Sequence, residues 1–179
     1  MSTPLNKIQL NRVQRLLRQS EGYLDLEMPQ HALENLRQID DPGELEFEFD
    51  LLRGITHKDL LDYSQALVYL EAAAALNRNS VSLQMALAWC YKRTARLPLA
   101  ITATELAHQL DPQEPILMYN LACYFALAGD KEQALSWLGR ALRLAPSVLR
   151  LIPKETDFDL LRHDPNFVRM LELAQTPKS

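Results

Sequence analysis

The feature that most constrains the fold is a pattern that returns every 34 residues along the chain. One position is alanine at every return: Ala32, Ala66, Ala100 and Ala134. The positions four and seven residues later are mostly apolar: Leu36, Leu70, Thr104 and Leu138, then Ile39, Ala73, Ala107 and Ala141. Twelve residues before each alanine stands a small residue: Ser20, Gly54, Ala88 and Ala122. These spacings are helical, and self-similarity at a fixed period indicates an array of structural repeats.

The stretch from Pro115 to Pro146 shows the content of one repeat most clearly. It reads as two amphipathic helices joined by a tight corner at Gly129-Asp130. Glycine accepts a positive φ in such a corner, and proline cannot continue a helix that reaches it. Small residues at the predicted crossing allow the two helices to approach closely.

Three residues after the small position comes an aromatic or histidine side chain: Tyr23, His57, Tyr91 and Phe125. A 34-residue helical hairpin with these features resembles the tetratricopeptide repeat, over about residues 13–148. The resemblance implies an all-α, right-handed superhelical solenoid with four repeats at about 13–46, 47–80, 81–114 and 115–148. We expect a capping segment over 149–175 and a single domain over 1–179. The first two repeats depart most from the family pattern.

Cap residues and prolines in the sequence predict where the helices begin and end. Thr3-Pro4 is typical of a helix start, and Asp164-Pro165 predicts an N-cap followed by a first-turn proline. The helices expected from these signals and from the repeat pattern span about 5–26, 29–39, 44–60, 63–76, 81–94, 98–110, 115–128, 131–144 and 166–174. A short helical turn is expected at 157–162, and Phe158, Leu161 and Phe167 are expected to cover the apolar face of the last repeat, because terminal repeats need such a cap.

The composition of the chain argues against several classes of protein function. The net charge of −4 and the pI near 5.6 argue against a general nucleic-acid-binding protein. The sequence has no long apolar run for a membrane helix and no signal-peptide pattern at its start. Its two cysteines, Cys90 and Cys123, occupy non-equivalent repeat positions and are interpreted as small buried residues in a reducing compartment. We therefore expect a cytoplasmic protein.

Charge is distributed unevenly along the chain. One segment holds six acids and no base: Asp40, Asp41, Glu44, Glu46, Glu48 and Asp50. Two others are basic: Lys7, Arg12, Arg15 and Arg18, and then Arg140, Arg143, Arg150 and Lys154. Such runs are either solvated faces or surfaces that steer a charged partner.

No pattern in the sequence predicts catalysis. There is no glycine-rich phosphate loop and no serine in a nucleophile elbow. The four histidines fall in different segments; His31 with Glu34, and His57 with Asp59, lack the further ligands that a metal site needs. We expect no enzyme activity, no cofactor and no metal site, and we interpret His57 as a packed core residue.

The resemblance implies that the first helix of each repeat lines a concave face, on which residues at helical spacing form one stripe. The stripe predicts a largely apolar partner-binding groove with lysines at one edge: Leu17, Leu51, Ile55, Lys58, Met85, Trp89, Lys92, Tyr119 and Cys123. Trp, Met and Tyr are typical of recognition surfaces. Some family members hold a peptide carboxylate with a basic clamp, but Leu17, Glu21, Met85 and Trp89 stand at the clamp positions here.

The sequence thus predicts a protein–protein interaction module that binds an amphipathic helix or an extended segment of a partner protein, with a dedicated chaperone or assembly factor as one form of it. The alternative is a structural protein that self-associates through its apolar groove or its capping face. The first hypothesis predicts a monomer, and the second predicts a homodimer or a larger assembly.

Overall fold

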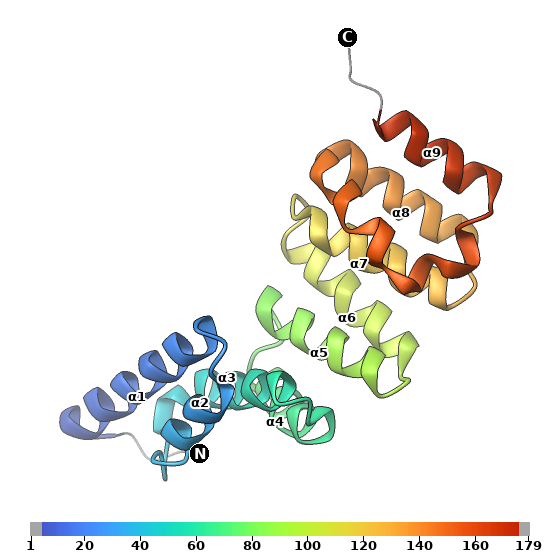
Figure 1. The fold of residues 1–179 in the computed structure, drawn as a ribbon. Helices are drawn as coiled ribbons and strands as arrows, with labels where there is room; N and C mark the ends of the chain where they lie inside the picture. Colours follow the sequence, from blue (N-terminus) through green and yellow to red (C-terminus); the bar gives the residue numbers. More distant parts are fainter. Residues whose placement is uncertain (1–4, 176–179) are drawn as a thin grey trace. The chain divides into compact units, whose positions relative to one another are not determined.

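The computed structural model describes residues 5–175 and is helical wherever it has regular structure (Figure 1). No strand occurs among these residues. The α-helices are α1 (Lys7–Asp25), α2 (Pro29–Leu36), α3 (Glu46–Asp59), α4 (Tyr63–Leu76), α5 (Val81–Arg93), α6 (Leu97–Leu110), α7 (Pro115–Leu127), α8 (Lys131–Leu144) and α9 (Pro165–Gln175). The 3-10 helices are η1 (Gly43–Leu45), η2 (Pro146–Arg150), η3 (Ile152–Lys154) and η4 (Thr156–Leu161).

The helices group into two compact units, which divide the chain between Ala95 and Arg96. The boundary falls at the corner between α5 and α6, inside the expected third repeat. The repeat limits and the single-domain organisation stay predictions.

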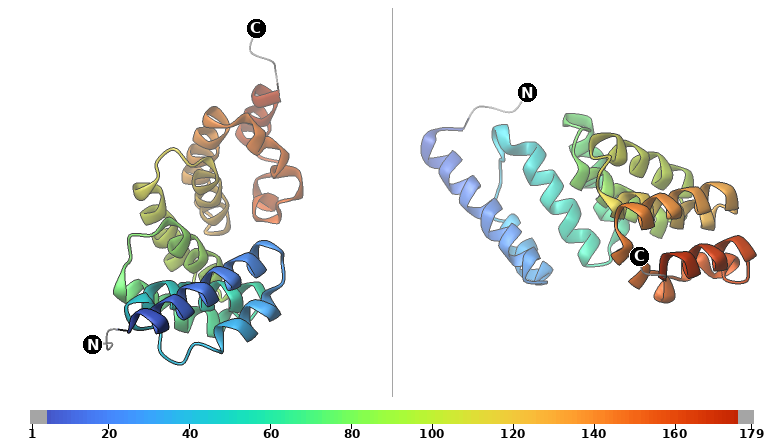
Figure 2. Two further views of the ribbon diagram at one scale, coloured as in Figure 1. Left: turned by 90° about the vertical axis from the view of Figure 1, so that its left-hand side faces the viewer. Right: turned by 90° about the horizontal axis from the view of Figure 1, so that it is seen from above.

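The first unit contains α1 to α5. Helices α1 and α2 form one hairpin, α3 and α4 form the next, and α5 packs against both helices of the second hairpin (Figures 1 and 2). One apolar cluster packs between the two hairpins. It consists of side chains from α1, α2, α3 and the segment that joins α2 to α3: Val13, Leu16, Leu17, Leu36, Ile39 and Phe49.

The second unit contains α6 to α9 with the 3-10 helices η2 to η4. Helix α6 packs on α7, which forms a hairpin with α8. After α8 the chain turns back, η4 packs on α7, and α9 packs on α8 (Figure 2). Phe158 of η4 and Phe167 of α9 are fully buried, with ring centroids 5.6 Å apart. The capping segment therefore packs on the last hairpin through buried side chains of its own, as the sequence predicted.

The small repeat positions are buried in both units, as the register predicted. All four alanines of the period, Ala32, Ala66, Ala100 and Ala134, have no exposed surface. At the α3–α4 crossing, an ideal Cβ built on Gly54 would lie 2.5 Å from Leu70 Cγ. Only glycine therefore fits between these two helices without a shift of the neighbouring helix.

Helix caps account for most of the observed limits. Helix α1 begins at Lys7, where the Asn6 side chain accepts hydrogen bonds from the backbone N–H groups of Ile8 and Gln9, each at 3.0 Å. Thr3-Pro4, the expected start, lies outside the described residues. At α9 the expected cap is present, because Asp164 Oδ1 accepts from Asn166 N at 2.9 Å and from Phe167 N at 3.3 Å.

The hairpin corners share a left-handed backbone conformation at the same 34-residue spacing. Glu27, Leu61, Ala95 and Gly129 have φ values of 56°, 62°, 59° and 77°. Gly129 adopts this conformation without a steric penalty, whereas the other three carry a Cβ that crowds the following carbonyl. The sequence pattern identified only the glycine corner, since nothing in the other three residues indicates a positive φ.

The substitution Leu61→Gly is therefore expected to stabilise the protein by about 1 kcal/mol, because it removes the strain of a left-handed residue. Leu61 is 71% exposed, so little packing is lost. Urea denaturation measures the change. Gly129→Ala is the reverse test at an equivalent corner and should destabilise by about the same amount. Equal stability of Leu61→Gly and wild type would show that the corner at Leu61 is unstrained.

Thr104 occupies a position that is leucine in the other copies, and its hydroxyl donates to the carbonyl oxygen of Ala100 at 2.8 Å. This local bond was expected from the sequence and is confirmed. Because the bond lies within one helical turn, Thr104→Val should change the free energy of unfolding by less than about 0.5 kcal/mol, or raise it slightly. Thermal denaturation checks this, and a large loss would mean that a longer-range partner is needed.

Candidate partner-binding site

Part of the predicted groove stripe lines one cleft in the first unit, between α3 and α5. The cleft has a volume of about 610 Å³, and we call it the Trp89 cleft. Its walls combine side chains that recur every three or four residues on each helix: Ile55, Lys58, Val81, Ser82, Met85, Ala86 and Trp89. Residues at this spacing share one helix face, which explains why the sequence stripe identified four of them.

Trp89 is the largest side chain of this cleft and is 41% exposed. The guanidinium carbon of Arg93, one turn further along α5, lies 4.8 Å from the centre of its indole ring. This cation–π contact favours the observed orientation of the ring by about 0.5–1 kcal/mol. An exposed aromatic side chain that is already oriented loses little conformational entropy when a ligand binds it.

Two lysines of the predicted stripe have different surroundings. Lys58 is half-buried at the edge of the cleft and forms an ion pair with the neighbouring Asp59. Lys92 is also half-buried but is absent from the lining of the Trp89 cleft. Next to Trp89 in α5, burial raises the pKa of Cys90 to about 11, so this thiol stays protonated at neutral pH and behaves as a small apolar residue.

Leu17 and Leu51 contribute to a different, smaller cleft of the first unit, between α1 and α3. Its volume is about 270 Å³, and charged side chains of both signs also line it, among them Arg18, Glu21 and Glu48. Leu17 itself is buried in the core that joins the two hairpins. These two positions therefore belong to a mixed surface beside that core.

Tyr119 and Cys123 do not lie on an open surface, which corrects their assignment to the groove. Both are in α7 and are buried, with 5% and 3% of their surface exposed. The ring of Phe158 lies edge-on to Tyr119 with centroids 5.8 Å apart, and the Tyr119 hydroxyl donates to Glu155 Oε2 at 3.5 Å. Burial, reinforced by Cys123 and Glu155, raises the pKa of Tyr119 well above its usual range. The capping segment covers this part of the stripe.

The same region contains a cluster with metal-ligand chemistry that sequence reasoning missed. Ligand atoms of Cys123, Glu155 and Asp157 all lie within 4.8 Å of one another. No spacing rule could have found this set, because the capping segment folds back to bring two of its acids to a cysteine of α7. The histidine pairs that the sequence analysis weighed have other surroundings: His31 contacts the ring of Tyr23, and His57 stacks on Tyr69.

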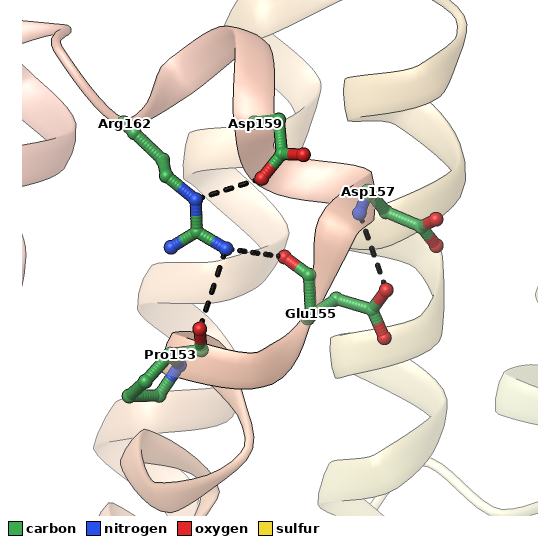
Figure 3. A network of polar contacts seen from close by, with 5 residues as sticks. All are labelled: Pro153, Glu155, Asp157, Asp159 and Arg162. Atoms are coloured by element: carbon green, nitrogen blue, oxygen red, sulfur yellow. Dashed lines mark hydrogen bonds and ion pairs between the residues drawn. The ribbon is translucent and has the colours of Figure 1, made fainter.

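Figure 3 shows that Glu155 already has a structural role in the cap. Its Oε1 accepts from Asp157 N at 3.2 Å, at the start of η4, and its carbonyl oxygen accepts from Arg162 Nη2 at 2.8 Å. Arg162 Nε also donates to Asp159 Oδ1 at 2.7 Å. This network holds η3 and η4 together, and it accounts for the position of the Glu155 side chain without a metal.

The sequence matches no family model and no curated protein. Its fold, however, matches solved structures. One is MamA from Desulfovibrio magneticus RS-1. It is 21% identical, the match covers 75% of this chain and 76% of that chain, and the TM-score is 0.68. Another is YrrB, described as a TPR protein with an unusual peptide-binding site. It is 23% identical, the match covers 71% of this chain and 66% of that chain, and the TM-score is 0.63. A third is PilF of Pseudomonas aeruginosa. It is 16% identical, the match covers 96% of this chain and 80% of that chain, and the TM-score is 0.69.

The helical hairpins, the buried small residues and these matches define the chain as an all-α protein with the tetratricopeptide-repeat fold. The resemblance seen in the sequence is thereby confirmed at the level of the fold. Within residues 5–175 no helix is both long and apolar enough to cross a membrane.

Proposed function

We propose that the protein is a non-enzymatic protein–protein interaction module and that it binds an apolar segment of a partner protein in the Trp89 cleft. The observation that carries this proposal is the exposure of a tryptophan, whose orientation is favoured by Arg93, in a largely apolar cleft. Tryptophan in such a position is typical of binding hot spots.

The chemistry of the cleft favours a ligand with regularly spaced Leu, Ile or Phe side chains, presented by an amphipathic helix or an extended segment. Ile55, Met85 and Trp89 supply apolar contacts, and Met adapts its shape to different side chains. Lys58 at the edge adds a positive charge that acts mainly on the association rate. The peptide-binding site described for YrrB supports a peptide as the class of ligand.

A dedicated chaperone or assembly factor is the form of this function that we favour, with the cytoplasm as its location. Such a factor needs a surface that accepts an apolar segment of its client reversibly, and the Trp89 cleft has the size and the composition for this. The two buried free cysteines are consistent with a reducing compartment.

Trp89→Ala is expected to weaken partner binding by about tenfold or more, because it removes the anchor of the cleft. The partner is first obtained by affinity capture from extract of the native cell with wild-type protein. A peptide scan of that partner then gives the probe, and its isotherm is measured by fluorescence anisotropy for wild type, Trp89→Ala and Ser82→Tyr. Ser82 is exposed and lines the cleft, so the tyrosine should block it without removing any native contact.

Val68→Ala is the matched control, since Val68 is 57% exposed on α4 and lies outside the cleft. It should leave the isotherm unchanged. Lys92→Ala should alter only the association rate and the salt dependence. If Trp89→Ala and Ser82→Tyr bind as wild type does while Lys92→Ala abolishes binding, the surface recognises charge and the proposal is wrong.

A further inference from the structure

A larger cleft lies in the second unit, between α8 and α9, and the proposed function does not use it. Its volume is about 840 Å³, and we call it the Arg143 cleft. Leu135, Leu142 and Met170 provide apolar surface within it. Gly139 also lines it, and a Cβ built on this glycine would meet nothing closer than Arg143 Nη1 at 3.6 Å. Met170 Cε would lie 3.7 Å from the same Cβ, which is an ordinary contact, so α9 lies close to α8 at Gly139.

The charge at this cleft is of one sign. Arg143 of α8 and Arg169 of α9 both line it and are both exposed. Each of these helices contains a single acid, Glu132 and Glu172, and neither is among the described residues that line the cleft. The cleft thus combines an apolar interior with two guanidinium groups, which bind carboxylates in a planar, two-pronged geometry. Its ligand should carry an apolar side chain flanked by acids.

The first unit of the same chain presents that chemistry on its surface. Glu44 lies in η1, and Phe47 and Glu48 follow three and four residues later in the first turn of α3, a helical spacing that favours one shared face. We call this the acidic face. Both glutamates are exposed, and Phe47 is half-exposed and is not part of the core cluster that contains Phe49. It lies within the segment of six acids and no base that the sequence analysis identified.

We propose that the Arg143 cleft of one copy binds the acidic face of a second copy, so that the protein associates through surfaces outside the Trp89 cleft, in contrast to the monomer expected from the sequence. Phe47 enters the apolar space between α8 and α9, and Glu44 and Glu48 pair with Arg143 and Arg169. Charge complementarity favours this occupant, because the acidic face lies within the most acidic segment of the chain, in the first unit, whereas Arg143 and Arg169 are exposed cations of the second unit. The two surfaces differ, so association is head-to-tail, and each pair of copies retains one unused surface of each kind.

The test measures the mass of the full chain by light scattering coupled to size-exclusion chromatography, over a wide range of concentrations and at low and high salt. At low salt the mean mass of wild type should rise with concentration past that of a dimer. It should fall back towards that of a monomer at high salt, because salt screens exposed charges.

Two charge-reversal variants then locate the surfaces. Arg143→Glu/Arg169→Glu and Glu44→Lys/Glu48→Lys should each weaken association by about a hundredfold. Each variant keeps one intact surface, so a mixture of the two should associate again. This recovery distinguishes a direct contact from a change in net charge. All altered side chains are exposed, and an unchanged thermal melt verifies that each variant is folded.

Arg140→Glu/Arg150→Glu is the control for net charge, because both arginines are exposed and neither lines the cleft. It should associate as wild type does. Trp89→Ala should also associate normally, so failure of the proposed function and failure of this inference can be told apart. A wild type that stays monomeric at every concentration at low salt overturns the inference. So does a mixture of the two reversal variants that does not associate, or a control that loses association equally.

Discussion

Phe158→Ala is expected to destabilise the second unit by about 3–5 kcal/mol, the cost of removing a buried phenylalanine from a packed core. Phe158 has no exposed surface and contacts the rings of Tyr119 and Phe167 at centroid distances of 5.8 and 5.6 Å. It thereby joins α7, η4 and α9. Its loss should leave a cavity that three separate segments would have to move to close.

The measurement is urea denaturation followed by the fluorescence of Trp137, which lies in α8 of the second unit, in a Trp89→Phe background. Leu160→Ala is a matched control in the same 3-10 helix, because Leu160 is 82% exposed. It should change stability by less than about 0.5 kcal/mol. If the two variants have the same stability, Phe158 does not hold the capping segment in place.

Gly54→Ala is expected to destabilise the first unit by about 2–3 kcal/mol, even though alanine is the better helix former. The added Cβ would lie 2.5 Å from Leu70 Cγ and Cδ2 and 3.2 Å from the Leu70 backbone nitrogen. The side chain of Leu70 is fully buried, so it has no open space into which to turn. The strain must then move α4 away from α3.

Gly22→Ala and Gly139→Ala are the controls, since both glycines are also in helix interiors. A Cβ on Gly22 meets nothing within 4 Å, and one on Gly139 meets only ordinary contacts from 3.6 Å. Both variants should gain about 0.5–1 kcal/mol from helix propensity. If thermal denaturation shows a loss of stability for Gly54→Ala and a gain for the two controls, the close α3–α4 crossing is verified. A gain at Gly54 would contradict it.

The helices could be predicted from the sequence because each carries local signals and the repeat multiplies them. Ala134 alone indicates little, but alanine at the same register in four copies identifies a crossing. The helix limits agree closely where a cap residue is present, as at Asp164. The strained corners at Glu27, Leu61 and Ala95 escaped prediction because backbone conformation there is imposed by the hairpin and not by the residue type.

The candidate site was predictable only in part. Trp89 and Met85 were placed on one surface because helical spacing puts them on one face of α5. Tyr119 and Cys123 fulfilled the same spacing rule in α7, yet the capping segment covers them. A periodic rule describes which face a residue lies on, whereas a non-repeating segment decides whether that face is open. The cluster of Cys123, Glu155 and Asp157 was missed for the same reason.

The boundary between Ala95 and Arg96 places α6 in the same unit as α7, the helix on which it packs. A fragment cut at the expected repeat limit, after residue 114, would contain α6 without α7, the helix on which α6 packs in the second unit. Its apolar side chains would then face water, and such a fragment would tend to aggregate. A fragment that begins at Arg96 keeps α6 together with α7. Studies that divide the protein should follow its packing rather than its period.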